Sequence, residues 1–305
     1  MEIDAEKVAA RIISFISQEV EQFQRDGAIL GMSGGIDSTL VATLAVQALG
    51  AKNILALLLP ERDSDSQSST DALKVIRRLG MPYREVPMTG ALSEIGIYKL
   101  IPLQVLGIRH VKEAMVKKYH RRQVEALGEM PFRAGLLGTK YVGDQRDTLN
   151  AGNAYARIKH RMRMVYLYYY ADLENRLVLG TTNRSEAMTG FTVKWGDNVA
   201  DIEPILQLYK TQVRQLAAYL GVPQEIIDKA PSPDLIPGIV DEIALGIDYA
   251  TLDRILVGIE QGWEIDRIAA ASRARPDQVT HVAEMVRRSY HLRQLPPVPD
   301  LSGLI

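Results

Sequence analysis

The strongest chemical signal in this chain is the run Ser33-Gly34-Gly35-Ile36-Asp37-Ser38. It follows a short apolar segment, residues 28–32, that is typical of a buried strand, and a helical apolar stretch comes next. Two glycines leave the backbone N–H groups accessible, and the positive end of the helix dipole points at the same place. The run therefore predicts a phosphate-binding turn, in which the serines add hydroxyl donors and Asp37 offers a carboxylate to a metal ion.

Two later segments supply the charges that such a turn needs. Arg157 and Arg161 are four residues apart on a predicted helix, so they share a face and can clamp a phosphate or a carboxylate. A predicted strand, residues 177–181, brings Thr181 and Glu186 to the edge of the sheet where the glycine-rich run lies. There Glu186 is a candidate second ligand for magnesium. The alternatives are a solvated basic helix face for the arginines and a simple helix N-terminal charge for Glu186.

Residues 189–201 form a long irregular segment, which indicates a functional loop rather than packing. Lys210 follows at the expected start of a helix. Because a lysine there opposes the helix dipole, an anionic partner explains it better than stability does. Residues 230–235, with the sequence APSPDL, and the acidic pair Asp241-Glu242 complete the set of polar segments.

These residues must be positioned by a regular framework, and the apolar pattern predicts one. Strands and helices alternate along the first 87 residues, and the apolar run at 54–59 suits a parallel strand buried on both faces. The alternation predicts an α/β fold with a doubly wound, mostly parallel sheet flanked by helices. The expected elements are an amphipathic helix at 4–25, helices at 38–49 and 71–79, a polar loop at 61–70, a strand at 83–87, and helices at 153–175 and 211–220.

The chain is expected to form a single domain over residues 1–305. Residues 90–150 form a variable insert whose basic clusters are best interpreted as solvated surface charge. Residues 240–295 are helical by period and form a helical C-terminal extension. Residues 296–305 form a proline-rich tail that we expect to be loosely held.

The bulk composition excludes several classes of protein. The formal net charge is −1, which argues against broad binding to nucleic acid or to an acidic membrane. No apolar run reaches the roughly 18–20 residues of a membrane span, and the acidic N-terminus is unlike a signal peptide, so we expect a cytoplasmic protein. The absence of cysteine excludes a cysteine nucleophile and a cysteine-type glutaminase. Any nitrogen that the protein transfers must arrive as free ammonia or from another chain.

The glycine-rich run resembles the loop of the ATP pyrophosphatases, which cleave ATP between its α- and β-phosphates. The ordered motifs SGGxDS, RxRM, LGTxxxxE, TGxxxKxGDxxxD, a lysine, PSxDL and DE resemble ammonia-dependent NAD synthetases over roughly residues 4–295, apart from the insert. That resemblance implies an adenine nucleotide alpha-hydrolase-like fold and a homodimer. The apolar stripe of the helix at 4–25, which needs a surface to pack on, also favours the homodimer. The resemblance further implies a ligase that uses ATP to adenylate the nicotinate carboxylate of deamido-NAD, after which ammonia displaces AMP.

The resemblance also implies a role for individual residues. Asp37, Lys210 and Lys194 are the implied catalytic residues, and Asp37 and Glu186 would bind Mg²⁺. Deamido-NAD would be bound by Arg161, Lys194, Asp201 and His291. The residues implied to bind ATP are Gly31, Met32, Ser33, Gly34, Gly35, Ile36, Asp37, Ser38, Thr181, Lys210 and Ser232.

This chain departs from the family pattern on the acceptor side. The residue after His291 is Leu292 where the family has lysine, and the loop 196–201 reads GDNVAD and lacks two glycines. Arg157 and Arg161 are also alternative candidates for the same family role on the acceptor side. Two alternatives therefore remain: an adenylating ligase of the same fold that acts on another carboxylic acid, and a non-catalytic nucleotide-binding regulator. A second metal carboxylate at Glu186 weighs against the regulator.

Overall fold

The computed structural model describes residues 1–100, 118, 120–136, 143–232 and 240–301 of the chain. Within these ranges the sheet has four strands, all parallel to their neighbours, in the order β3-β2-β1-β4. The chain enters the sheet at its centre, pairs outward to one edge, and returns much later with the fourth strand at the other edge. The strands are β1 (Gly27–Gly31), β2 (Ile54–Leu58), β3 (Tyr83–Glu85) and β4 (Arg176–Val178).

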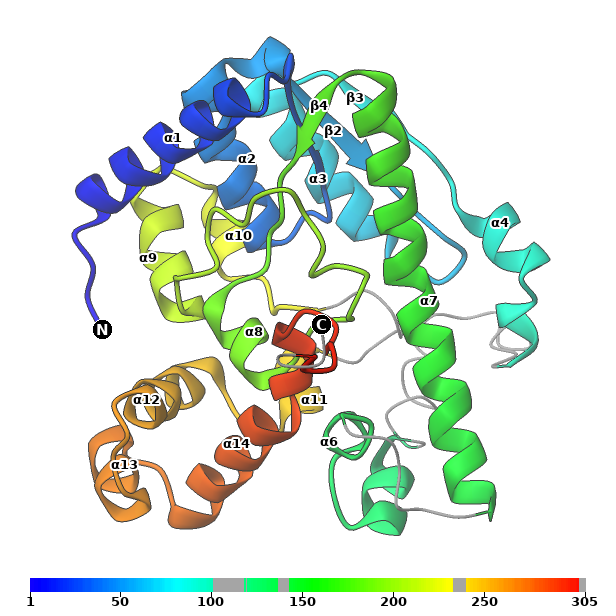
Figure 1. The fold of residues 1–305 in the computed structure, drawn as a ribbon, viewed down its shortest axis with the longest axis vertical. Coiled ribbons are helices and arrows are strands. Elements are labelled where there is room, and N and C mark those ends of the chain that lie inside the picture. The colour runs from blue at the N-terminus through cyan, green and yellow to red at the C-terminus, as the bar shows by residue number, and fades with distance from the viewer. Residues whose placement is uncertain (101–117, 119, 137–142, 233–239, 302–305) are drawn as a thin grey trace.

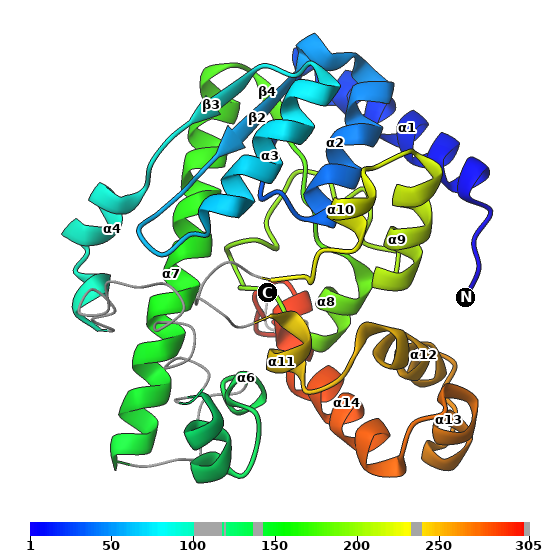
Figure 2. The same cartoon turned by 180° about the vertical axis from the view of Figure 1, so that it is seen from behind.

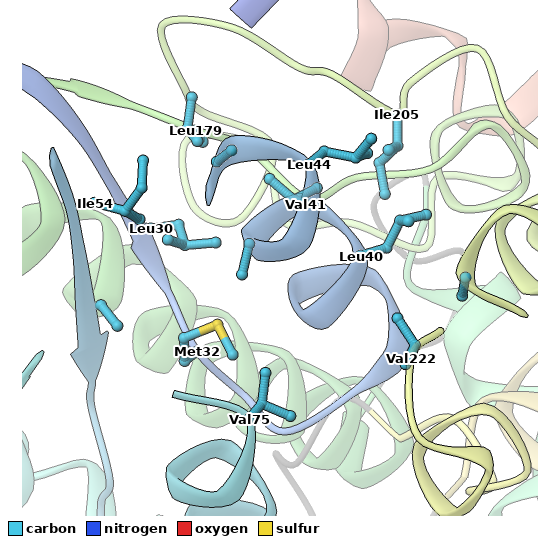
Figure 3. Close-up of a cluster of buried hydrophobic side chains, with 14 of the residues drawn as sticks. Leu30, Met32, Leu40, Val41, Leu44, Ile54, Val75, Leu179, Ile205 and Val222 are labelled. Carbon is cyan, nitrogen blue, oxygen red and sulfur yellow. The ribbon is translucent and has the colours of Figure 1, made fainter. Parts of the chain in front are cut away.

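The two central strands are buried on both faces because successive side chains point in opposite directions. Leu30 and Ala56 belong to one hydrophobic cluster, whereas Ile29 and Leu57 belong to another. Figure 3 shows Leu30 in the first cluster, close to α2. The helices that contribute to this cluster are α1 (Ala5–Gln22), α2 (Ile36–Leu49), α3 (Ser66–Leu79), α9 (Lys210–Tyr219) and α10 (Gln224–Ile227).

The opposite face of the sheet is covered chiefly by α7 (Gly143–Leu173), a helix of 31 residues. Figure 1 shows α7 running from beside the sheet down to the helical half of the molecule. Its buried Tyr155 and Ala171 pack with Leu92 of α4 (Thr89–Glu94) and with the 3-10 turn η2 (Ile97–Lys99). Another 3-10 turn, η1 (Ala51–Asn53), leads into β2.

A second group of helices surrounds a separate apolar cluster that contains Leu252, Leu256, Val279 and Val282. Figure 2 shows α11 to α14 gathered on one side of the molecule, below the sheet. This group comprises α6 (Pro131–Ala134), α8 (Arg184–Thr189), α11 (Asp241–Leu245), α12 (Tyr249–Glu260), α13 (Ile265–Ser272), α14 (Pro276–Arg288) and the 3-10 turn η4 (Tyr290–Arg293). The predicted α/β fold class with its helical C-terminal extension is confirmed.

Several predicted boundaries differ from the observed ones. The loop predicted at 61–70 is already helical from Ser66, because Asp65 caps α3 by accepting a hydrogen bond from the Gln67 N–H group. The helix predicted at 153–175 begins ten residues earlier, at Gly143. Of the predicted insert at 90–150, residues 101–117, 119 and 137–142 lie outside the described residues. No helix in the described ranges is long and apolar enough to cross a bilayer.

The first helix corrects one part of the sequence analysis. An amphipathic helix can pack on its own core or on a partner, and its apolar stripe was one reason to expect a homodimer. In the structure Ile12, Ile16 and Val20 of α1 are buried against α2 and α9 of the same chain. The stripe is therefore no argument for a dimer.

Because α1 covers the core of its own chain, Ile16→Ala should lower the free energy of unfolding by about 2–5 kcal/mol. Ile16 has no exposed surface, whereas the control Phe23 is 47% exposed and Phe23→Ala should cost much less. Chemical denaturation at low and high protein concentration measures both. A loss for Ile16→Ala that depended on protein concentration would place α1 in an interface instead.

Candidate active site

The predicted phosphate turn joins β1 to α2, and its shape requires glycine at position 34. Gly34 has φ +72°, and a Cβ atom there would lie 2.3 Å from the Ser68 carbonyl oxygen and 2.9 Å from the Ala72 nitrogen. Ser33 and Ser38 close the turn with their hydroxyl oxygens 3.0 Å apart. The backbone is therefore held against α3, with the start of α2 directed into the turn.

This turn lines a cavity at the carboxyl ends of β1, β2 and β4, the edge at which open α/β sheets bind ligands. Of the predicted ATP residues, Thr181, Lys210 and Ser232 line the same cavity. Asp234 and Leu235 of the PSxDL motif lie outside the described residues. Side chains that line the cavity and had no predicted role include His160, Arg163, Phe191, Asp197, Lys229 and Asp241.

Lys210 is the centre of an ion cluster beside the turn. Its Nζ lies 2.5 Å from Asp37 Oδ2 and 3.2 Å from Glu186 Oε1, although only 2% of the lysine side chain is exposed. The Asn183 side chain donates to the other Asp37 oxygen at 3.0 Å. Asn183 also caps α8 reciprocally with Glu186, which fixes that carboxylate at the third helical position. Three elements that are far apart in the sequence, α2, α8 and α9, meet at one amine.

Asp241 is a third carboxyl group at this cluster. Tyr249 donates a hydrogen bond to its Oδ2 at 2.8 Å, while its Oδ1 is buried without a hydrogen-bond partner in the described part of the chain. The sequence marks the Asp241-Glu242 pair as part of a motif but predicts no role for it. Asp241 lines the cavity, and its unpartnered buried oxygen is a candidate contact for a ligand or a cation.

The charges in this cluster shift each other's protonation equilibria. Burial raises the pKa of Glu186 to about 8, and Lys210 opposes that rise. Burial alone would lower the pKa of Lys210, but the carboxylates of Asp37 and Glu186 outweigh it and raise that pKa. Lys210 therefore stays charged. Two carboxyl groups contact the ammonium group and Asp241 acts on it electrostatically, so the cluster has capacity for a further cation.

Three of the four predicted acceptor residues are connected through the loop at 190–201. Arg161 of α7 donates to the Lys194 carbonyl oxygen from Nε at 3.3 Å. The Lys194 ammonium group in turn donates to the carbonyl oxygens of His291, at 2.8 Å, and of Gln294, at 3.2 Å. The structure thus brings α7, the irregular loop and the turn η4 together.

The fourth of these residues, Asp201 at the end of the same loop, and the alternative candidate Arg157 make other contacts. Asp201 accepts a hydrogen bond from the Val178 N–H group at 2.8 Å and one from the Tyr168 hydroxyl at 3.1 Å, and so holds the end of β4. Arg157, the competitor of Arg161, donates to the Gly135 carbonyl oxygen at 2.7 Å. One helical turn thus separates an arginine that reaches the loop from one that reaches the C-cap residue of α6.

A second buried ion cluster was not foreseen. Lys159 of α7 has no exposed side-chain surface and lies 2.9 Å from Glu61 and 3.2 Å from Asp63, both in the segment after β2. The hydroxyl groups of Tyr98 and Tyr155 donate to these two carboxylates. The cluster attaches the β2–α3 segment to α7. No sequence signal indicated it, because the lysine and the acids are almost 100 residues apart.

The described residues contain no group of three or more His, Cys, Asp or Glu side chains that could hold a metal ion by themselves. Asp37 and Glu186 nevertheless fit a magnesium ion bound together with phosphate. Mg²⁺ is usually held by one or two carboxylates, with phosphate oxygens and water completing its shell. The cluster around Lys210 therefore suits a metal that arrives with a nucleotide.

The fold and the cavity are typical of α/β enzymes that bind a phosphorylated ligand at the first strand-to-helix turn, with acids and a lysine beside it. The model of the NAD synthase family matches residues 8–99 and 135–296. The chain belongs to the NAD synthase family. The resemblance seen in the motifs is confirmed, and with it the predicted class of enzyme, a ligase of NAD synthesis.

Individual relatives agree with this assignment. The chain is 43% identical over 277 residues to the NH(3)-dependent NAD(+) synthetase of Thermotoga maritima, and the match covers 91% of this chain and 95% of that protein. It superposes with TM-score 0.70 and 27% identity on the NMN synthetase of Francisella tularensis. The NH3-dependent NAD synthetase of Campylobacter jejuni gives TM-score 0.67 and 25% identity. Both structural matches cover 98% of this chain and 100% of the other.

Glu203 supports the strand end that carries Thr181. A Cβ atom on Gly180 would lie 2.2–2.3 Å from the Glu203 carboxyl group, and the Thr182 N–H group donates to Glu203 at 3.2 Å. Burial raises the pKa of Glu203 to about 8. The folded protein therefore keeps this carboxyl group protonated at pH values where the unfolded chain has already ionised it.

Glu203 should thus make unfolding easier as pH rises from about 5 to about 8, because the unfolded state binds fewer protons there. The free energy of unfolding should therefore decrease over this pH range in wild type. We expect Glu203→Gln to reduce that decrease by at least about 1.4 kcal/mol, the equivalent of one pKa unit. Denaturant unfolding at pH 5, 6.5 and 8 measures the slope. The control Glu21→Gln changes an exposed residue of α1 and should follow wild type. Parallel pH profiles for wild type and Glu203→Gln would contradict the assignment.

Proposed function

We propose that this chain is an ATP-dependent ligase that amidates deamido-NAD with ammonia and releases NAD, AMP and pyrophosphate. One observation carries the proposal. A single cavity joins the phosphate turn and the Lys210 cluster to His160 of α7 and to Phe191 and Asp197 of the loop at 190–201. Family membership and the name of the Thermotoga relative support the same reaction.

The chemistry explains why both parts of the cavity are needed. A carboxylate does not react with ammonia at neutral pH, so it must first become an acyl adenylate. That step moves the α-phosphate of ATP and leaves pyrophosphate, and negative charge builds up on the phosphate oxygens. The N–H groups of the turn and the ammonium groups of Lys210 and Lys194 are the donors that we assign to this charge. The chain then mainly positions the reactants and neutralises charge.

We propose Mg²⁺ as the cofactor, with Asp37 and Glu186 as its protein ligands. When it is bound, Mg²⁺ neutralises phosphate charge. The partnership of both acids with Lys210 supports the proposal, since an ion cluster with excess acid favours a further cation. The unpartnered oxygen of Asp241 adds to that excess. For ATP itself we assign residues 31–38, Thr181, Lys210 and Ser232.

For deamido-NAD we assign Arg161, Lys194, Asp201 and His291. The contacts among three of them, Arg161, Lys194 and His291, support a shared role. A second acceptor is nicotinate mononucleotide, which is favoured by the superposition on an NMN synthetase and by the altered loop 196–201. The non-catalytic regulator has less support, because the named relatives are synthetases.

We also propose a homodimer in the cytoplasm, without nucleic acid or a membrane as a partner. A net charge of −1 supports the absence of those two partners. Support for the dimer comes from the family resemblance and from α7, on which Val165, Tyr169 and Leu173 are 51–62% exposed. These residues are four apart, so they share one face of the helix. An exposed apolar face of this kind suits a protein interface.

The function is tested by measuring AMP and pyrophosphate release with ATP, Mg²⁺ and ammonium. The acceptors are deamido-NAD, nicotinate mononucleotide and an unrelated carboxylic acid. We expect turnover with deamido-NAD and ammonium, and little turnover with glutamine, since the chain has no cysteine to liberate ammonia. Preference for the mononucleotide would select the second acceptor. No AMP with any acceptor would favour the regulator.

The arginine pair separates the acceptor side from the ATP side. Arg161→Ala should raise the KM for the acceptor about ten- to a hundredfold, the effect of losing a contact of about 1.5–3 kcal/mol, and leave the KM for ATP nearly unchanged. Arg157→Ala is the matched control, because its guanidinium group contacts Gly135 instead of the loop. Lys210→Ala should impair ATP use with every acceptor. A larger acceptor effect for Arg157→Ala would move the assignment by one helical turn.

A further inference from the structure

His160 is a cavity residue for which the assigned roles leave no task. It lies on α7, directly before Arg161, and lines the cavity together with the phosphate turn. Its Nδ1 is 3.5 Å from Asp197 Oδ2, and its side chain is 12% exposed. Among the described residues, His160 Nε2 has no hydrogen-bond partner. The atom is not fully buried either.

Asp197 is itself held in place. Its Oδ1 accepts a hydrogen bond from the Val193 N–H group at 2.6 Å, and its carbonyl oxygen accepts one from the Thr182 hydroxyl at 3.2 Å. The carboxylate thus faces Nδ1 from a fixed loop, which favours the tautomer with the proton on Nδ1. A carboxylate that orients an imidazole in this way leaves the other nitrogen free to accept a proton.

The surroundings keep the imidazole uncharged. Burial lowers the pKa of His160, and the positive charges of Lys159 and Arg163 on the same helix lower it further. Asp197, on the loop packed against it, acts in the opposite direction. The packing is close, since a Cβ atom on Gly196 would lie 3.0 Å from the His160 Cβ. A neutral imidazole near neutral pH is a competent proton acceptor.

We infer that His160 is the general base of the amidation step, with Asp197 as the residue that positions it. This inference rests on the proposed function and extends it to the second half of the reaction. The neighbours of His160 agree with that assignment: Arg161 on one side contacts the Lys194 carbonyl, and Asp197 belongs to the same loop. The dyad therefore lies on the acceptor side of the cavity.

In this step one proton passes from the attacking nitrogen to His160. The ammonia nitrogen attacks the acyl carbonyl carbon of the adenylate and forms the C–N bond, so the nitrogen becomes a positively charged –NH3 group. His160 Nε2 takes one proton from that group. The adduct then collapses, the bond from carbon to the AMP phosphate oxygen breaks, and AMP leaves with the electron pair. The amide is the product, and the imidazolium group returns its proton to water.

Other titratable groups in the cavity are less suited to this task. Asp37 and Glu186 are paired with Lys210 at the phosphate turn. Asp241 lies within the electrostatic reach of Lys210 and Asp37, on the same ATP side. Arg163 and Lys229 are cations. Among the described residues that line the cavity, His160 combines a neutral lone pair with an orienting carboxylate.

The test separates adenylation from amidation in His160→Gln and Asp197→Asn. Pyrophosphate release from ATP and deamido-NAD in the absence of ammonia measures the first step, and conversion of the preformed adenylate on adding ammonia measures the second. We expect His160→Gln to adenylate within about threefold of wild type and to amidate about a hundredfold more slowly, in the usual range for a lost general base. Asp197→Asn should show the same split in weaker form. His120→Gln, which changes a histidine outside the cavity, is the control.

Two readouts distinguish a base from a merely structural residue. Hydroxylamine forms an adduct whose N–H protons are more acidic than those of the ammonia adduct, so the defect of His160→Gln should shrink at least tenfold with it. The amidation rate per unit of free ammonia should fall in acid for wild type as His160 becomes protonated, and the variant should lose that dependence. Equal defects in both steps, or equal defects with both nucleophiles, would overturn the inference. If wild type itself releases no pyrophosphate with deamido-NAD, the proposed function fails instead.

Discussion

The structure depends on one buried ion cluster, in which the Lys210 ammonium group is held by carboxylates. Transferring such a charge out of water costs several kcal/mol unless oppositely charged, hydrogen-bonded partners surround it. Here the partners come from the starts of α2 and α8, and Asp241 of α11 adds a further acid nearby. The lysine can therefore be buried only when α2, α8 and α9 are packed in their native positions. The same packing of the three helices also forms the candidate site, because the ion cluster lies beside the phosphate turn.

A second cluster gives α7 its position. Lys159 is fully buried between Glu61 and Asp63. If α7 slid or rotated against the segment after β2, a buried charge would lose its partner, which is costly. The residue that follows, His160, and Arg161 after it face the loop at 190–201. The acceptor side of the cavity is thus aligned by an ion pair that takes no direct part in the proposed chemistry. We interpret the two clusters as fixed points for the two halves of the reaction.

The loop at 190–201 connects the halves. It has no helix or strand of its own, and its conformation is set by contacts at both ends: Asp201 holds β4, and the Lys194 side chain binds carbonyl oxygens of η4. The Lys194 ammonium group therefore already donates hydrogen bonds to the carbonyl oxygens of His291 and Gln294. For its proposed role in acceptor binding, this lysine would have to exchange those carbonyl oxygens for the acceptor.

Local sequence patterns predict the individual elements and the chemistry they carry. Gly34 and Gly35, the alternation of strands and helices, and Lys210 at a helix start are visible because each depends on neighbours a few residues away. Motif order was enough to identify the family. Tertiary structure alone decided that α1 buries its stripe in its own core, that Lys159 meets two acids almost 100 residues away, and that Asp197 faces His160. These pairings join residues that are distant in sequence, and no local pattern marks a side chain by the partner it will meet.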